Sequence, residues 1–205
     1  TIYNPFDFDK IKRLSQAACP HRWLGVDNPP VVLAAGRLCE QKDFVTRLRA
    51  FRLVRDRMRA RLVILGEGSL RAELEEAARA LGLTTEDVDF PGFTSNPYAY
   101  MARAAVFVLS SRWEGLPGVL IEAMACGTAV VSTDCPSGPR EILEDGRWGA
   151  LVSVGDPQAL AQAILRTLNT PRKLQPDGRQ RAQDFAQARS IDQYLAVLGL
   201  ATHAT

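Results

Sequence analysis

Residues 105–132 read AVFVLSSRWEGLPGVLIEAMACGTAVVS, and this stretch contains the pattern from which the fold is predicted. An apolar run at 105–109 is followed by a loop rich in glycine and proline, by a helical stretch around Glu122, and by a second apolar run at 129–132. Continuously apolar runs are typical of strands that are buried on both faces. The stretch therefore predicts a strand, a helix and a second strand parallel to the first.

The same alternation extends over most of the chain. Amphipathic helical patterns at 44–58, 70–81 and 160–168 lie between further apolar runs at 31–35, 61–65, 88–90 and 150–152. Such regular alternation predicts an α/β protein with a Rossmann-like, doubly wound parallel sheet and helices on both faces. In sheets of this kind ligands bind beyond the carboxyl ends of the strands.

Helix signals and composition shifts suggest three segments. Residues 1–30 are a proline-punctuated lead-in with a helix at about 9–18, residues 31–175 form the sheet domain, and residues 176–205 form two short helices. Asn96 and Asp156 each precede a proline and are expected to cap a helix, and Gly82 is expected to end one. Because the chain begins at Thr1 without an initiator methionine or a leader, we expect it to be part of a longer protein.

Composition excludes several classes of function. Lys and Arg number 25 against 23 Asp and Glu, and this net charge of +2 argues against a nucleic-acid-binding protein driven by bulk charge. No apolar stretch approaches the roughly 18 residues of a membrane span. The cysteines and histidines lack zinc-ligand spacing, so no metal is expected, and we interpret the cysteines as reduced thiols of a cytoplasmic protein: Cys19, Cys39, Cys126 and Cys135.

Cations follow the first predicted strand. Gly36-Arg37-Leu38 comes directly after it, and Lys42 lies five residues beyond Arg37. A guanidinium fork and an ammonium group at a strand-to-helix turn suit a ligand with more than one phosphoryl group. The alternative, which spacing alone slightly favours, is two solvated surface cations.

Two further strand ends carry glycine or aromatic loops. Gly66-Glu67-Gly68 resembles the start of a dinucleotide-binding fingerprint, but Arg71 occupies the position of the third glycine. We therefore reject a nicotinamide or flavin site and favour a tight turn. Phe93 lies in a loop that could bind a flat ring, or it could simply pack in the interior.

The loop after the fourth strand carries paired carboxylates. Glu114 and Glu122 are eight positions apart, and Gly115 and Gly118 expose backbone amides between them. A carboxylate can accept hydrogen bonds from both hydroxyls of a diol. Cations for phosphates and carboxylates for hydroxyls together indicate a nucleotide sugar. The alternatives are a solvated Glu114 and a Glu122 that interacts with the helix dipole.

Taken together, these motifs resemble the family 4 glycosyltransferases, which have the two-domain GT-B architecture. The matching elements stand in the family's order along residues 1–200: Asn4-Pro5 as hinge, Gly36-Arg37-Leu38 with Lys42, Gly66-Glu67-Gly68, Pro91-Gly92-Phe93, Glu114 through Glu122 as an E-x7-E signature, and Glu141. The resemblance implies that the chain is the C-terminal, donor-binding half of such an enzyme. Residues 176–205 would then pack back toward an N-terminal domain, which would hold the acceptor.

The resemblance also implies a role for each residue. Arg37 and Lys42 would hold the diphosphate, Glu114 would lie beside the sugar, and Glu122 would bind the ribose diol. The remaining donor contacts would come from Gly36, Gly66, Gly68, Phe93 and Gly115, and from the amides of Leu116, Pro117, Gly118 and Val119. It implies transfer with retention of configuration and no metal or other cofactor.

The identity of the donor rests on one variant turn. Residues 135–140, CPSGPR, are similar to the turn of members that use UDP-linked galactose or N-acetylhexosamine, so a UDP-sugar is favoured over a GDP-sugar. The acceptor would be a glycan or a lipid-linked glycan. Two alternatives stay open: a non-catalytic module that binds a nucleotide sugar or another anion, and a GT-B epimerase.

Seven arginines occur within residues 47–61. The simpler interpretation is a solvated helix face opposite the apolar stripe. The alternative is peripheral contact with anionic lipid at the inner face of a membrane, which a lipid-linked acceptor would favour.

Overall fold

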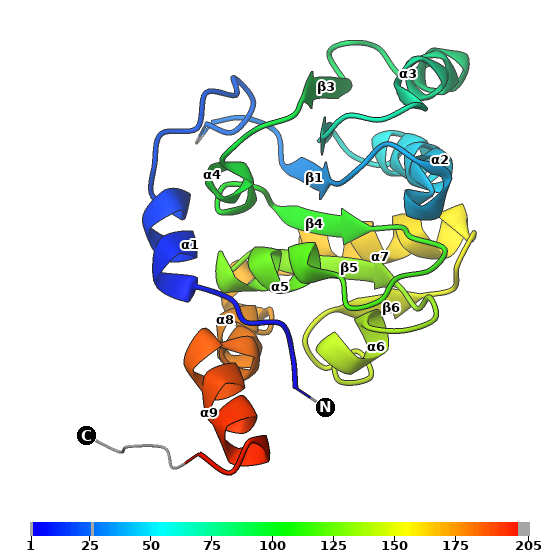
Figure 1. The fold of residues 1–205 in the computed structure, drawn as a ribbon. Coiled ribbons are helices and arrows are strands. Elements are labelled where there is room, and N and C mark those ends of the chain that lie inside the picture. Colours follow the sequence, from blue (N-terminus) through cyan, green and yellow to red (C-terminus); the bar gives the residue numbers. More distant parts are fainter. Residues whose placement is uncertain (1, 26, 201–205) are drawn as a thin grey trace.

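The computed structural model describes residues 2–25 and 27–200, and it contains a parallel sheet of six strands (Figure 1). The strands are β1 (Val31–Ala35), β2 (Arg61–Leu65), β3 (Val88–Gly92), β4 (Val106–Leu109), β5 (Ala129–Thr133) and β6 (Ala150–Val152). Their order in the sheet is β3-β2-β1-β4-β5-β6, and every neighbouring pair is parallel. The predicted Rossmann-like α/β class is confirmed.

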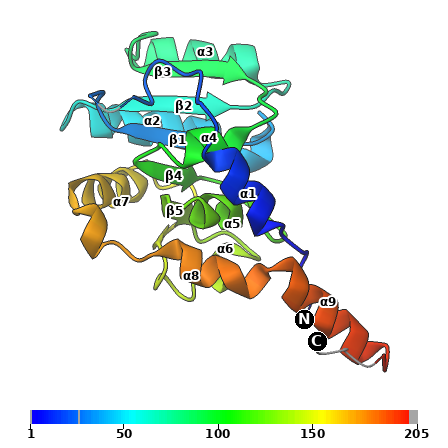
Figure 2. The same ribbon diagram turned by 90° about the vertical axis from the view of Figure 1, so that its left-hand side faces the viewer.

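Helices cover both faces of this sheet (Figure 2). They are α1 (Phe8–Ser15), α2 (Phe44–Arg55), α3 (Arg71–Ala80), α4 (Pro97–Met101), α5 (Gly118–Ala125), α6 (Pro139–Ile142), α7 (Pro157–Asn169), α8 (Gly178–Ala182) and α9 (Gln187–Val197). Val32 and Ala34 of β1 face the core under α2, α3 and α7, whereas Val31 and Leu33 face the core under α1, α4, α5 and α8. The central strand β1 is thus buried on both sides, as its unbroken apolar sequence predicts.

The strand order reverses between β1 and β4. The chain builds outward from β1 through β2 to β3, and then returns to add β4, β5 and β6 on the other side. At such a switch point the loops that follow the two central strands diverge and leave a crevice at the carboxyl edge of the sheet. The loop from β1 to α2 and the loop from β4 to α5 therefore flank the expected ligand site.

Most of the predicted helix signals are confirmed. Asp156 accepts a hydrogen bond from the Ala159 N–H at 2.9 Å, and Gly82 follows α3 in the left-handed conformation with φ of 71°. Asn96 is the exception, because its side chain does not cap α4 and donates instead to the Leu14 carbonyl at 3.0 Å. The predicted helix at 9–18 is α1, which ends at Ser15.

The arginine run does not form one solvated face. Arg47 is 1% exposed, lies 4.4 Å from the Phe44 ring and has no hydrogen-bond partner for Nε or Nη1 among the described residues. Burial lowers the pKa of its guanidinium to about 9. Arg55 pairs with Asp87. The solvated-face interpretation is therefore wrong for Arg47. Arg49, Arg57 and Arg59 are exposed, and lipid contact of the arginine run stays a prediction.

Phe6, near the start of the chain, meets residues 185–187 beside the sheet. The Phe6 N–H donates to the Phe185 carbonyl at 3.1 Å, and the Gln187 N–H donates to the Phe6 carbonyl at 3.1 Å. Beyond this contact α9 projects away from the body of the molecule, as both ribbon views show. The predicted domain limits at residues 30 and 175 stay predictions. None of the described helices has the length and apolar character that a membrane crossing needs.

Candidate nucleotide-sugar site

The loops that follow β1 and β4 are tied together across the switch point. The Arg112 N–H donates to the Gln41 carbonyl at 2.8 Å, and Gln41 Nε2 donates to the Trp113 carbonyl at 2.9 Å. The buried Ser110 hydroxyl, directly after β4, donates to the Lys42 carbonyl at 2.7 Å. These bonds fix the two loops side by side, so that Lys42 and Glu114 meet although they are 72 residues apart in sequence.

Lys42 and Glu114 form a largely buried ion pair. Lys42 Nζ lies 2.6 Å from Glu114 Oε1, and the side chains are 17% and 7% exposed. The Ser111 hydroxyl donates to the same carboxylate oxygen at 2.6 Å. The alternative of a solvated side chain is therefore wrong for Lys42 and for Glu114, whereas Arg37 is exposed, as that alternative expects. The Lys42 side chain also passes over Gly36, where an added Cβ would lie 3.5 Å from Lys42 Cε.

Gly66 and Gly68 allow the loops after β1 and β2 to touch. A Cβ on Gly66 would lie 2.0 Å from the Gly36 carbonyl oxygen, and one on Gly68 would lie 2.2 Å from that of Leu38. The Leu38 N–H donates to the Glu67 carbonyl at 2.9 Å in this contact. The two glycines thus serve close backbone packing, whereas their predicted contact with the donor stays a prediction.

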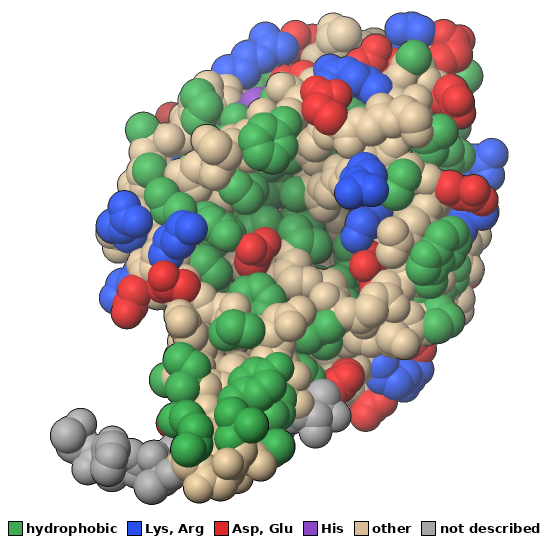
Figure 3. Space-filling view, viewed as in Figure 1, with side chains coloured by type: hydrophobic (Ala, Val, Ile, Leu, Met, Phe, Trp, Pro, Cys, Tyr) green, Lys and Arg blue, Asp and Glu red, His purple; other side chains and the backbone are tan. Residues whose placement is uncertain are grey.

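A cavity of about 350 Å³ opens beside these glycines. The face seen in Figure 3 is hollowed near its centre, with hydrophobic side chains in the hollow and charged ones beside it. Phe93 is 78% exposed, so the alternative of interior packing is wrong for this residue. The cavity is lined by Ala35, Gly36, Arg37, Leu65, Gly66, Glu67, Phe93, Thr94 and Pro97.

Glu122 lies on α5 and points toward α4. The Tyr98 hydroxyl donates to Glu122 Oε1 at 3.0 Å, and Tyr98 directly follows Pro97, which lines the cavity. Burial raises the pKa of the Glu122 carboxyl, and the Tyr98 hydrogen bond lowers it. Burial and the neighbouring Glu122 charge raise the pKa of the Tyr98 phenol, so it remains a donor. Glu122 is in the second turn of α5, so interaction with the helix dipole does not explain its position.

The loop from Glu114 to α5 is braced from the side of β5. The Glu114 N–H donates to the Pro136 carbonyl at 3.2 Å, and Gly138 packs so closely that a Cβ there would lie 2.4 Å from the Gly115 carbonyl oxygen. Helix α5 begins at Gly118 without a side-chain cap, which leaves its first amides available. The predicted amide of Pro117 is corrected here. Proline has no backbone N–H, so the predicted hydrogen-bond donors of this loop are limited to the amides of Leu116, Gly118 and Val119.

The structure also identifies site residues that the sequence did not single out. Gln41, Ser111 and Tyr98 orient the loops and the two carboxylates, and they were missed because each acts on a residue brought close only by the fold. Only the position of Tyr98, next to a helix-starting proline, could have drawn attention to it. The described residues contain no cluster of His, Cys, Asp and Glu that could hold a metal.

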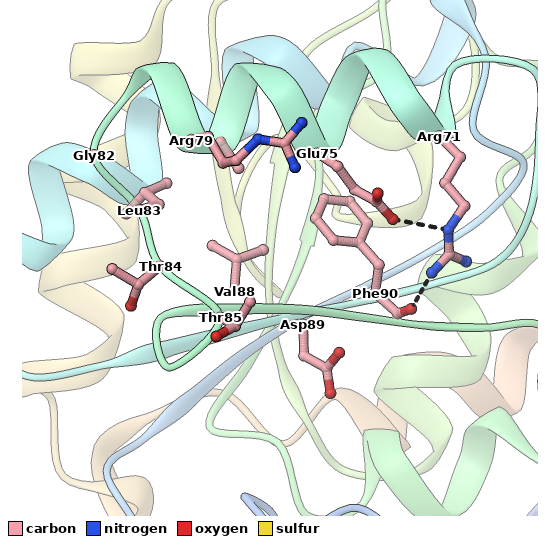
Figure 4. Close-up of a pocket in the computed structure, with 11 residues that line it drawn as sticks. Arg71, Glu75, Arg79, Gly82, Leu83, Thr84, Thr85, Val88, Asp89 and Phe90 are labelled. Carbon is pink, nitrogen blue, oxygen red and sulfur yellow. Dashed lines mark hydrogen bonds and ion pairs between the residues drawn. The ribbon is translucent and has the colours of Figure 1, made fainter.

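A larger hollow of about 620 Å³ lies away from these residues, between α3 and the edge strand β3 (Figure 4). Its floor includes Leu83 and Val88, and Arg71 stands at one end. Arg71 is already engaged, because it pairs with Glu67 and Glu75 and donates to the Phe90 carbonyl. None of the predicted site residues lines this hollow.

The chain belongs to the family described as glycosyl transferases group 1, whose sequence model matches residues 29–170. A relative from Campylobacter jejuni is the N-acetylgalactosamine-N,N'-diacetylbacillosaminyl-diphospho-undecaprenol 4-alpha-N-acetylgalactosaminyltransferase. The two sequences are 36% identical over 189 aligned residues, and the alignment covers 91% of this chain and 48% of the relative. The chain therefore spans about half the length of this relative.

Solved glycosyltransferases share the fold. The structure of Alr3699/HepE of Anabaena in complex with UDP and glucose superimposes on this chain with a TM-score of 0.79 and 26% sequence identity. The match covers 97% of this chain and 56% of the Alr3699/HepE chain. The structure of a glycosyltransferase of Rickettsia africae matches with a TM-score of 0.81, over 96% of this chain and 55% of the Rickettsia chain. Because the sequence identity is 18%, this similarity shows the fold alone.

Proposed function

We propose that this chain is the donor-binding half of a glycosyltransferase that uses a nucleoside diphosphate sugar. The observation that carries the proposal is the buried Lys42–Glu114 pair, which lies at the switch point of the sheet. Gly36 lies against Lys42 and also lines the cavity, together with Arg37. A cation, a carboxylate and an open cavity thus occur together where ligands bind in doubly wound sheets.

In this proposal the diphosphate lies between Arg37 and Lys42. When the bond from the sugar to the diphosphate breaks, negative charge develops on the departing phosphate. The Lys42 ammonium group, held by Glu114, and the exposed Arg37 guanidinium stabilise that charge. Glu114 then accepts hydrogen bonds from sugar hydroxyls, and Glu122 accepts from the ribose diol. Transfer proceeds with retention, without a metal and without an assigned protein nucleophile.

We favour a UDP-sugar as the donor and a lipid-linked glycan as the acceptor. Alr3699/HepE, 26% identical to this chain, is described in complex with UDP. Two Campylobacter jejuni relatives, 36% and 32% identical, are named as N-acetylgalactosaminyltransferases with undecaprenol-linked substrates. Because the chain covers about half of these relatives, we place the acceptor site in another part of a longer protein.

Titration calorimetry tests the proposed donor site. UDP should bind, and GDP and uridine should bind more weakly, because GDP carries a different base and uridine lacks the diphosphate. Arg37→Ala should weaken UDP about tenfold or more, as expected for the loss of a charge-assisted hydrogen bond, while uridine affinity changes little. Arg49→Ala, an exposed arginine on α2, is the control.

Absence of UDP and GDP binding at millimolar ligand would contradict the proposal. Transfer itself is measured with the longer protein, a panel of UDP-sugars and lipid-linked acceptors. Binding of UDP without transfer to any acceptor would reduce the function to a nucleotide-sugar-binding module.

A further inference from the structure

The carboxylate of Glu122 is held at one oxygen and open at the other. Oε1 accepts from the Tyr98 hydroxyl at 3.0 Å. Oε2 has no hydrogen-bond partner among the described residues. It is also absent from the fully buried polar atoms that lack a partner there, so it is accessible to solvent. A partly buried carboxylate with one oxygen fixed and one exposed can receive hydroxyl donors from a ligand.

The hydroxyl that holds Glu122 comes from a firmly anchored element. Side chains at both ends of α4 hold it against the C-terminal end of α1. Before α4, Asn96 Nδ2 donates to the Leu14 carbonyl at 3.0 Å. After α4, Arg103 donates to the Ser15 carbonyl of α1 and to the Ala99 carbonyl of α4. Thr128 donates to the Met101 carbonyl at the end of α4. These contacts fix the backbone that carries Tyr98.

Tyr98 and Glu122 connect α4, which borders the cavity through Pro97, to α5, which contributes no residue to the cavity lining. Pro97, the first residue of α4, lines the cavity, and α5 begins at the end of the loop that carries Glu114. A glutamate has several rotamers, and without the hydroxyl the carboxylate would have to be fixed anew when a ligand binds. Ordering a glutamate side chain costs conformational entropy, which a preformed hydrogen bond removes from the cost of binding.

We infer that Tyr98 is a positioning residue, whose hydroxyl holds the Glu122 carboxylate in the orientation that binds the ribose diol of the nucleotide. This inference rests on the proposed function and extends it to a residue that makes its contribution through Glu122. The phenol remains a donor at neutral pH, because burial and the Glu122 charge both favour its protonated form.

The test compares UDP with 2′-deoxy-UDP on Tyr98→Phe, which keeps the ring and removes the hydroxyl. Loss of a hydrogen bond to a charged group should weaken UDP binding about tenfold. The loss should be much smaller for 2′-deoxy-UDP, which presents one hydroxyl of the diol to Glu122. In Glu122→Ala, which leaves Tyr98 no side chain to hold, the further change Tyr98→Phe should add little, because the two residues act as a unit.

Tyr100→Phe is the matched control, because Tyr100 lies on the same helix and is buried, but does not bond to Glu122. Its UDP affinity should equal that of the wild type. Unchanged UDP affinity of Tyr98→Phe would overturn the inference, and so would an equal loss for UDP and 2′-deoxy-UDP, which marks a merely structural role. If the wild-type chain binds no UDP, the proposed function itself fails.

Discussion

Partly or largely buried carboxylates lie near the switch point of the sheet, and single residues there are placed at a cost in stability. Glu114 has a cation and a hydroxyl as partners, whereas Glu122 has a neutral phenol. A neutral donor compensates less of the desolvation of a carboxylate than an ammonium group does. Glu122 is therefore the residue at which stability and proposed binding oppose each other.

Glu122→Gln should stabilise the chain at neutral pH. Burial raises the pKa of the Glu122 carboxyl above its usual value of about 4.5, so the folded state binds this proton more tightly than the unfolded state does. The stability that this group contributes is present below pH 4.5 and is lost as pH rises through the folded-state pKa. The uncharged glutamine avoids this loss and still accepts from Tyr98.

Thermal unfolding from pH 4 to pH 8 measures the effect. We expect Glu122→Gln to raise the Tm by roughly 2 °C near pH 7, which corresponds to less than about 1 kcal/mol, and to lose the advantage as pH falls toward 4. Glu73→Gln, an exposed glutamate in the first turn of α3, is the control. A Tm difference that is constant over this pH range would contradict the assignment to the Glu122 carboxyl.

At the scale of elements, the contact between the ends of β1 and β2 depends on the absence of side chains. Gly68→Ala would place Cβ 2.2 Å from the Leu38 carbonyl oxygen and 2.6 Å from its nitrogen, both backbone atoms that cannot rotate away. The loops must separate, and we expect a loss of about 2 kcal/mol or more of unfolding free energy, measured by urea denaturation.

Gly115→Ala provides the comparison, because nothing lies within 4 Å of a Cβ at that position and no strain is expected. Equal stability of the two variants would show that the loops after β1 and β2 are not packed as described.

The elements themselves were largely predictable from sequence. Strands buried on both faces give unbroken apolar runs, and Asp156 before Pro157 gave a correct helix start, because both signals are local. Asn96 before Pro97 has the same pattern, but the Leu14 carbonyl of α1 takes its side chain. A tertiary contact thus overrides a local signal, and no spacing within the α4 segment could reveal it.

At the scale of the whole molecule, the motifs placed the candidate residues at the carboxyl edge of the sheet but did not predict the contacts among them. Arg37, Lys42 and Glu114 were predicted because each follows a strand end, and the switch point brings two of these ends together. Whether Lys42 faces solvent or Glu114 depends on a pairing across 72 residues. The burial of Arg47 was likewise unpredictable, because the arginine run gives no sign of which member faces the core.

The projecting helix α9 gives the last prediction. Its exposed apolar side chains are Ile191 at 46%, Tyr194 at 52% and Val197 at 76%, followed by Leu198 at 67%. An apolar row on a helix that extends from the body favours association with another surface. The chain should therefore self-associate with increasing concentration, and Val197→Asp should reduce this, as measured by sedimentation velocity over a concentration series.

Leu174→Asp is the matched control, because Leu174 is 69% exposed but lies outside this row. It should self-associate like the wild type, and both variants should keep the wild-type affinity for UDP, since neither residue lines the cavity. Equal effects of the two substitutions on self-association would mean that exposed apolar area in general, rather than the α9 row, is responsible. Retained self-association in Val197→Asp would remove α9 as the contact surface, because a carboxylate buried in an apolar interface without a partner strongly opposes association.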